Sequence, residues 1–306
     1  MATTRFRADR GLQTRMALTM FLLGLLFVAF MAALVAISVA PLVIAVVGAG
    51  FLFFQFYASD RIALFAMHGR EVTPEEAPEL HAIVDRLCAL ADMPKPRVAI
   101  ADSDIPNAFA TGRSPQRAVV CATTGIMRRL DREELEGVLA HELSHVAHRD
   151  VMVMTFASFL GILAGMITRF TLYAGMFGGG GRRNDNNNNA ALMVFAVMAV
   201  SMVVYALSFL LTRALSRYRE LAADRAGALL TGAPSALASA LTKVTGDMAR
   251  IPTNDLRSAE PFNAFFFAPA FAKGFSISSL FSTHPTLDKR LAELGKIARE
   301  LGQPGA

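Results

Sequence analysis

The sequence is poor in cysteine and in charge. Its two cysteines, Cys88 and Cys121, are too few for a disulfide framework, which fits a reducing compartment. Charged residues make up 18% of the 306 residues, whereas soluble proteins contain about 25%. Because 54% of the residues are hydrophobic, the chain can bury a core, and intrinsic disorder is excluded. The charges fall in two long stretches, which argues against a transporter embedded entirely in the membrane.

The charge that is present is basic overall, with a net value of +5 at pH 7. Such a balance can indicate nucleic-acid binding, but arginine-rich flanks of membrane segments give the same number. The net charge is the only feature that supports a nucleic-acid role. We therefore expect no nucleic-acid partner.

Charge is absent altogether from residues 16–59. As a helix, these 44 residues would extend about 66 Å, enough to cross a hydrocarbon core of about 30 Å twice. Pro41 lies near the middle, where a turn is needed, so we predict two spans at 15–37 and 39–57. The alternative is a cleaved signal peptide, whose apolar region runs only about 7–15 residues.

A second pair of uncharged segments covers residues 151–168 and 190–212, and predicts two more spans. Residues 178–189 between them are mostly glycine and asparagine, which predicts a flexible loop. The alternative is a helical hairpin buried inside a globular domain.

Basic residues in the flanks predict the orientation of these spans. The first 15 residues carry four arginines and one aspartate, so the N-terminus should face the cytoplasm. With four spans, residues 58–150 and 213–306 then face the cytoplasm as well. Arg182 and Arg183 in the loop argue weakly the other way.

Residues 141–145 read His-Glu-Leu-Ser-His. Residues four apart on a helix share one face, so His141 and His145 can reach one metal ion. Glu142 projects about 100° away, beside the metal, where it can hold the attacking water and take its proton. This pattern is typical of zinc peptidases. The alternative is a pair of ordinary surface histidines.

The flanks of this motif predict the helix that it needs. Asp131 followed by Glu134 resembles a capping box. Leu135, Val138 and Leu139 then give an apolar face at helical spacing.

A catalytic zinc ion usually has three protein ligands, and the sequence offers two candidates for the third. His148 lies about 10.5 Å further along the helix axis, and no glycine breaks the helix before it. It is better interpreted as a cation near the helix C-terminus. Glu220 and Asp224 share a helix face; Glu220 could bind the metal while Asp224 accepts the other ring N–H of a ligating histidine. From their spacing alone, Glu220 and Asp224 more often belong to a helix face exposed to solvent.

Two further segments carry motifs. Residues 107–111, a turn and residues 118–123 predict a β-hairpin, whose outer strand could pair with an extended substrate. A purely structural hairpin is the alternative. His284 precedes Pro285 and a helix with leucines at i, i+4 and i+7, so it could simply begin that helix. The phenylalanine-rich residues 262–281 favour core or membrane contact over specific recognition.

Four motifs, taken in their order along the chain, resemble those of the HtpX-type membrane zinc metalloproteases, relatives of the CAAX prenyl protease. The resemblance extends over nearly the whole chain. One departure is Pro285-Thr286, where many relatives have a second proline. From the N-terminus, the matching motifs are Asn107-Ala108-Phe109-Ala110-Thr111-Gly112, His141-Glu142-Leu143-Ser144-His145, the Glu220…Asp224 segment and Ser282-Thr283-His284-Pro285.

The resemblance implies the roles of the site residues. One Zn²⁺ per chain would be held by His141, His145 and Glu220, with Asp224 behind a ligating histidine. Glu142 would be the catalytic base, and His284 would act near the oxyanion or a substrate carbonyl. Residues that would bind the substrate backbone are Asn107, Ala108, Phe109, Ala110 and Thr111.

The resemblance also implies a setting for the protein. It would lie in the bacterial inner membrane as a multi-pass protein, with its active site facing the cytoplasm. It would cleave unfolded or misfolded membrane proteins under stress, in contact with lipid. Complexes with other membrane proteases are a further class of partner.

We therefore expect a mostly α membrane protein with four transmembrane helices and an α+β zincin-like catalytic domain containing a small β-hairpin or sheet. Bringing Glu220 to the two histidines requires a catalytic domain interrupted by spans. The expected parts are 1–57, the first pair of spans; 58–150, the first part of the catalytic domain; 151–212, the second pair; and 213–306, the second part.

The expected function is a membrane-bound zinc endopeptidase. A protease that cuts inside the bilayer would need its motif within a long apolar helix, but charged residues flank this one on both sides. A membrane adaptor or holdase with a structural zinc is the alternative from another class. It would need a fourth protein ligand, and neither cysteine lies in a metal-binding motif.

Overall fold

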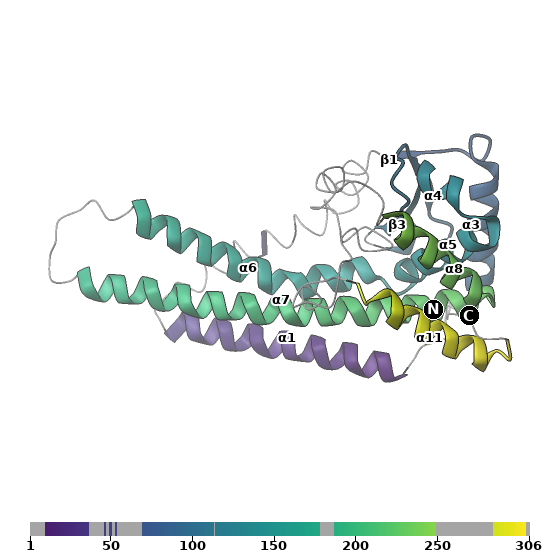
Figure 1. The fold of residues 1–306 in the computed structure, drawn as a ribbon. Coiled ribbons are helices and arrows are strands. Elements are labelled where there is room, and N and C mark those ends of the chain that lie inside the picture. Colours follow the sequence, from purple (N-terminus) through teal and green to yellow (C-terminus); the bar gives the residue numbers. More distant parts are fainter. Residues whose placement is uncertain are drawn as a thin grey trace. The chain divides into compact units, whose positions relative to one another are not determined.

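The computed structural model describes residues 10–36, 46, 49–50, 53, 69–112, 114–177, 187–248 and 284–303. The chain divides into two compact units (Figure 1). One unit comprises Met1–Thr14, Tyr57–Met152 and Ser216–Ala306; the other comprises Arg15–Phe56 and Val153–Leu215.

Three long helices carry the apolar segments. They are α1 (Arg10–Ala36), α6 (Asp150–Phe177) and α7 (Asn187–Thr231). The stretches long and apolar enough to cross a membrane are Arg10–Ala36, Asp150–Tyr173 and Leu192–Thr231. Three of the four predicted spans fall on these helices.

The fourth predicted span, 39–57, lies outside the described residues except for a few isolated positions. Most of the predicted glycine- and asparagine-rich loop also lies outside them. Its last three residues, 187–189, are an exception: they form the first turn of α7, so the helix begins earlier than predicted.

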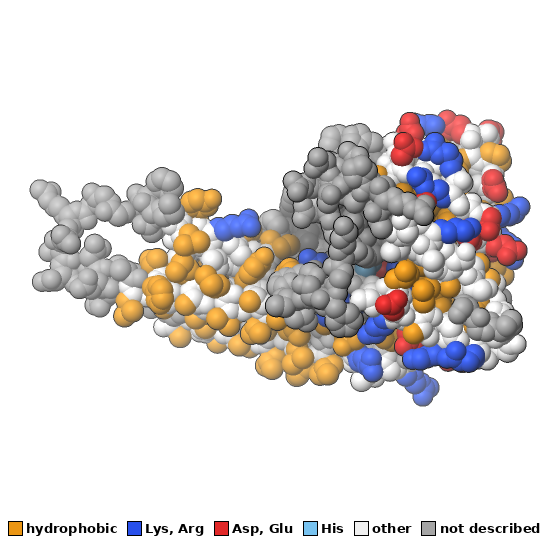
Figure 2. All heavy atoms as spheres, in the orientation of Figure 1, with side chains coloured by type: hydrophobic (Ala, Val, Ile, Leu, Met, Phe, Trp, Pro, Cys, Tyr) orange, Lys and Arg blue, Asp and Glu red, His pale blue; other side chains and the backbone are white. Residues whose placement is uncertain are grey.

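Within the apolar unit, the three helices bury one side and expose the other. Phe30 and Leu34 of α1 and Leu160 of α6 are among the buried side chains of one shared cluster. Phe170 and Phe195 are mostly exposed, and hydrophobic side chains gather on the visible surface of these helices (Figure 2). Only 22%, 28% and 22% of the three apolar windows are buried. This exposure fits helices that face lipid and does not support a hairpin buried in a globular domain.

The other unit contains a four-stranded mixed sheet. Its strands are β1 (Gly69–Glu71), β2 (Arg97–Ala101), β3 (Ala108–Thr111) and β4 (Val119–Thr123), in the order β1-β2-β4-β3. β2 and β4 are parallel, and the other neighbours are antiparallel. The predicted hairpin is present as β3 and β4, with Phe109 opposite Cys121. β3 is an edge strand of the described sheet.

Helices pack around this sheet and share one apolar core. Buried side chains from all five helices belong to a single cluster, which includes Leu87, Leu139 and Leu241. Leu287, Leu291 and Leu294 also pack there, which confirms the predicted amphipathic helix at the C-terminus. The helices are α3 (Pro78–Ala91), α4 (Thr124–Arg129), α5 (Arg132–Ala147), α8 (Pro234–Met248) and α11 (Leu287–Glu300), with a 3₁₀ turn at Pro115–Arg117.

The predicted capping box fixes the start of α5. The Asp131 carboxylate accepts the Glu134 N–H at 2.9 Å, and the Glu134 carboxylate accepts the Asp131 N–H at 3.0 Å. At the other end, Arg149 has φ 56°, a left-handed conformation that ends the helix. α6 begins at the next residue, Asp150.

Candidate active site

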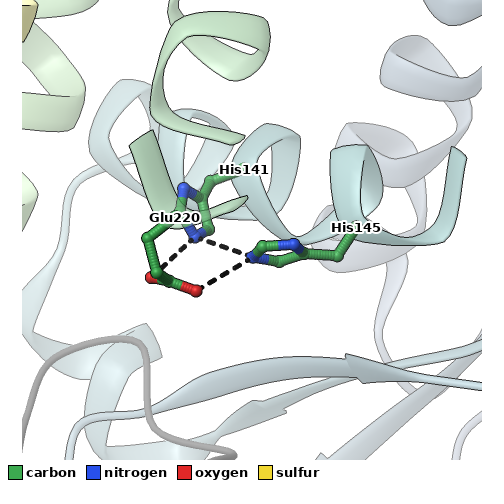
Figure 3. A group of neighbouring side chains, drawn as sticks. All are labelled: His141, His145 and Glu220. Carbon is green, nitrogen blue, oxygen red and sulfur yellow. Dashed lines mark hydrogen bonds and ion pairs between the residues drawn. The ribbon is translucent and has the colours of Figure 1, made fainter. Parts of the chain in front are cut away.

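His141, His145 and Glu220 come together although α5 and α7 are far apart in sequence. One ligand atom from each lies within 4.8 Å of the others. The two Nε2 atoms are 3.2 Å apart, and the Glu220 oxygens lie 3.7 Å from Nε2 of His141 and 3.4 Å from Nε2 of His145. Figure 3 shows the carboxylate pointing toward both imidazoles. These three residues are the one group among the described residues with the proximity that a shared metal ion requires.

An aspartate lies behind each histidine. Nδ1 of His141 is 2.9 Å from an Asp224 oxygen, and Nδ1 of His145 is 2.5 Å from an Asp150 oxygen. An ionised carboxylate only accepts hydrogen bonds, so we assign the ring proton of each histidine to Nδ1. Each Nε2 then presents a lone pair, and two lone pairs 3.2 Å apart repel unless a cation lies between them. The residues therefore fit a metal ion.

An arginine lies behind each aspartate. Arg290 donates from Nε and Nη2 to the two Asp224 oxygens at 2.7 and 2.6 Å. Arg219 pairs with Asp150. Both arginines are buried, at 1% and 3% exposure. Burial is the largest single influence and would lower the pKa of Arg290. The charge and hydrogen bonds of Asp224, together with the charges of Glu220 and Glu142, outweigh it, so this pKa lies above its usual value.

Sequence reasoning missed Asp150, Arg219 and Arg290. Asp150 is five residues after His145, a spacing that leaves the shared helix face, and it reaches the ring only because the chain turns at Arg149. Arg219 adjoins Glu220 and gave no separate signal. For Arg290, the one available signal was a charged residue on the buried side of an amphipathic helix.

Glu142 is buried between α5 and the edge of the sheet. One of its oxygens accepts the backbone N–H of Ala110 in β3 at 3.0 Å. Burial raises the pKa of Glu142 to about 7, although the neighbouring His145 opposes this shift. The carboxyl group is therefore poised to exchange a proton near neutral pH.

His284 lies just before α11 and contacts the same cluster. Its Nδ1 is 2.9 Å from a Glu220 oxygen, and the side chain is buried. α11 begins at Leu287 with Thr286 at its N-cap, so Pro285 lies just before the helix and not in its first turn.

The side chains of the predicted substrate-binding strand are mostly buried. Asn107, Ala108, Phe109 and Thr111 are buried, and only Ala110 is partly exposed. The Phe109 ring packs against Val119 and Cys121 in a small core, so it is a packing side chain. Any contact of this segment with a substrate would have to use its backbone.

His148 takes no part in the cluster. Its Nδ1 donates to the Ser144 carbonyl at 2.8 Å. This contact with a carbonyl of the last turn places His148 at the C-terminal end of α5, as predicted; its charge stays a prediction.

Comparison with known proteins identifies the family. A model of peptidase family M48 matches residues 74–298. The chain belongs to peptidase family M48. This M48 peptidase is 62% identical to Protease HtpX homolog 1 of Streptomyces coelicolor over 99% of its own length and 98% of that protein. It is 55% identical to Protease HtpX homolog of Moorella thermoacetica, over 96% and 97% of the two chains.

The fold also has a solved counterpart. The crystal structure of S. mikatae Ste24p matches 94% of this chain and 67% of that chain, with a TM-score of 0.53 and 19% identity. At that identity the match concerns the fold alone.

The family and its HtpX relatives make this protein a membrane metallopeptidase. They confirm the resemblance to HtpX-type proteases and the expected enzyme class. Nothing in the comparisons supports the adaptor or holdase alternative.

Proposed function

We propose that this M48 peptidase is a zinc endopeptidase whose metal ion is held by His141, His145 and Glu220. The observation that carries the proposal is the convergence of three ligand atoms within 4.8 Å, with both Nε2 atoms directed at one point. Two imidazoles and one carboxylate form a ligand set found in catalytic zinc sites, which leaves a position open for water or substrate. Zinc in such a site supplies a Lewis acid and lowers the pKa of water.

Glu142 is the proposed catalytic base. It adjoins the metal ligand His141 in sequence, and its pKa of about 7 suits a group that takes a proton from water and returns it to the leaving amine. Before a substrate binds, the hydrogen bond from Ala110 holds its carboxylate in place.

The substrate is proposed to bind as an extended strand along β3. Backbone pairing at a sheet edge reads no side chain, which suits a protease with a loose sequence preference. The β3 edge supports this because its Ala110 N–H reaches the carboxylate of Glu142, so the strand edge and the proposed base are adjacent.

His284 is proposed to stabilise the oxyanion or a substrate carbonyl. Its 2.9 Å contact with Glu220 supports a place beside the metal, since Glu220 is a proposed ligand. Positively charged or N–H-bearing groups near a developing oxyanion lower the barrier.

The cellular setting is proposed from the sequence flanks and from the resemblance to HtpX-type proteases. We propose a multi-pass protein of the bacterial inner membrane with its active site on the cytoplasmic side, as the arginine-rich N-terminus predicts. Its substrates would be misfolded or damaged membrane proteins, cleaved under stress. Lipid contact and complexes with other membrane proteases belong to the same proposal.

The test compares wild type with Glu142→Gln, both purified in detergent without metal and then given zinc. Cleavage of an unfolded protein such as casein is followed alongside bound metal. We expect one zinc ion in each protein and cleavage by the wild type only, because the amide cannot take the proton from water. Full turnover by Glu142→Gln would contradict the assigned base. Stoichiometric zinc without cleavage in either protein, repeated in lipid with membrane-protein substrates, would favour the adaptor alternative.

A further inference from the structure

Helix α7 approaches α5 closely at Gly227. A Cβ atom built on this glycine would lie 2.9 Å from the backbone N of His141 and 3.2 Å from its Cα. Carbon atoms in good contact are about 3.5–4.0 Å from their neighbours. The atoms in the way belong to the backbone of α5, so no side chain could rotate aside to make room. Gly227 is buried, and any larger residue there has to push the two helices apart.

The contact involves a metal-ligating residue on one helix and the face that carries the third ligand on the other. Residues at i, i+4 and i+7 share a helix face, so Glu220, Asp224 and Gly227 form one row along α7. All three meet His141: Glu220 at Nε2, Asp224 at Nδ1 and Gly227 at the backbone. Gly227 is two turns, about 10.5 Å, from Glu220 along the axis.

We propose that Gly227 is a positioning residue that sets the spacing between α5 and α7, and so the distance from Glu220 to the two histidines. The inference rests on the proposed metal site. Alanine at this position requires a separation larger by about 0.5 Å. Functional groups need to be held within about 0.5 Å of their productive geometry, so a shift of this size weakens the ligand set even though every ligand remains present.

Glycine is otherwise a poor choice for this position. In the interior of a helix it is less favourable than every residue except proline, so helix propensity alone favours alanine at 227. Gly246 in α8 provides a matched control, because a Cβ built there meets no atom within 4 Å. Gly246→Ala therefore adds the same methyl group without a close approach.

The experiment measures zinc binding by the full chain in detergent. Wild type, Gly227→Ala and Gly246→Ala are purified metal-free and titrated with zinc against a chromophoric chelator. We expect Gly227→Ala to bind zinc at least about tenfold more weakly, as other changes to groups that orient metal ligands do, and Gly246→Ala to bind as the wild type does. The visible spectrum of added Co²⁺ should change with Gly227→Ala only, because it reports the geometry of the ligands.

Thermal unfolding separates positioning from simple packing. If Gly227→Ala lowers the midpoint without metal but gains the same increment from zinc as the wild type, Gly227 has only a packing role and the proposal is wrong. Failure of Gly227→Ala to fold without metal would overturn it too, since a half-ångström shift of one helix should leave the core formed. Failure of the wild type itself to bind zinc would refute the metal site instead.

Discussion

At the scale of single residues, the site depends on charges that are buried in pairs. Asp224 lies between Arg290 and His141, and Asp150 between Arg219 and His145. A buried carboxylate has one favourable orientation when a guanidinium holds both of its oxygens. Arg290 holds Asp224 in this way, so the imidazole of His141 is fixed as well, and Arg290 also lies 3.9 Å from Glu220. Arg219 contacts the oxygen of Asp150 that does not face His145.

Replacement of Arg290 tests this arrangement. Arg290→Met removes the cation and leaves the Asp224 carboxylate buried without its bidentate partner. Breaking a buried pair costs about 3–5 kcal/mol, so we expect a lower thermal midpoint, together with zinc affinity reduced about 10–100-fold. Chelator competition and thermal unfolding in detergent would measure both effects.

The control is an ion pair that links the same two helices at the protein surface. Arg225 of α7 pairs with Glu300 of α11 at 2.9 Å, with both side chains partly exposed. Exposed pairs contribute about 0–1 kcal/mol, so Arg225→Ala should leave zinc affinity unchanged. Equal losses in the two variants would show that α7–α11 packing, rather than the buried charge pair, matters for the metal.

At the scale of elements, α5 has both ends fixed by local signals. Its capping box begins the helix at a defined residue, and the left-handed Arg149 ends it before Asp150. Because both histidines lie on this one helix, its register decides where their rings point. Glu134 is tied further by Ser239 of α8, whose hydroxyl donates to it at 2.6 Å.

Removal of the cap should weaken the helix measurably. Asp131→Ala leaves the Glu134 N–H without its acceptor, and such changes cost about 0.5–2 kcal/mol. We expect a lower midpoint of thermal unfolding for the metal-free protein. Arg132→Ala, one residue along and exposed, should change stability by no more than about 0.5 kcal/mol. Similar midpoints for Asp131→Ala and wild type would mean that tertiary contacts alone hold this end.

The elements show what local sequence patterns can predict. The capping box, the hairpin of β3 and β4 and the amphipathic α11 each depend on residues close in sequence, and each is present. The residues behind the two histidines could not be predicted from local patterns. Asp150 reaches His145 only through a backbone turn, and Arg290 comes from a helix about 150 residues away. The proximity of Glu220 to His141 and His145 agrees with what the family resemblance implied, whereas its spacing to Asp224 alone favoured a solvated face. That these residues bind zinc stays a prediction.

At the scale of the whole molecule, the chain alternates between apolar and polar parts. Three described helices are long and apolar enough to span a membrane, while charged side chains gather over the unit that carries the sheet (Figure 2). The division at residues 57, 150 and 212 was drawn from such changes in composition and stays a prediction. The span at 39–57 and the phenylalanine-rich segment at 262–281 fall almost entirely outside the described residues.

Single introduced cysteines can test the orientation, because the native thiols should not react. Cys88 and Cys121 are buried, and burial raises their pKa values to about 11 and about 12. Only the thiolate is reactive. In spheroplasts, an impermeant maleimide should label Asp185→Cys in the predicted external loop. Glu79→Cys, exposed on α3, should react only after permeabilisation.

The wild type should remain unlabelled under both conditions. The reverse pattern, with Glu79→Cys labelled in intact spheroplasts and Asp185→Cys protected, would place the active site on the external side and refute the proposed orientation.

The hydrogen bond between Ala110 and Glu142 has a consequence for how the enzyme rests between substrates. A backbone N–H makes one good hydrogen bond, and here the carboxylate occupies it. A peptide that adds to β3 along this edge would offer a carbonyl to the same donor, so the arriving strand and the carboxylate compete for it. When the peptide carbonyl takes this donor, the Glu142 carboxylate is released beside the bound peptide. The free enzyme therefore keeps the Glu142 carboxylate hydrogen-bonded to β3, and only a peptide extended enough to pair with this edge releases it.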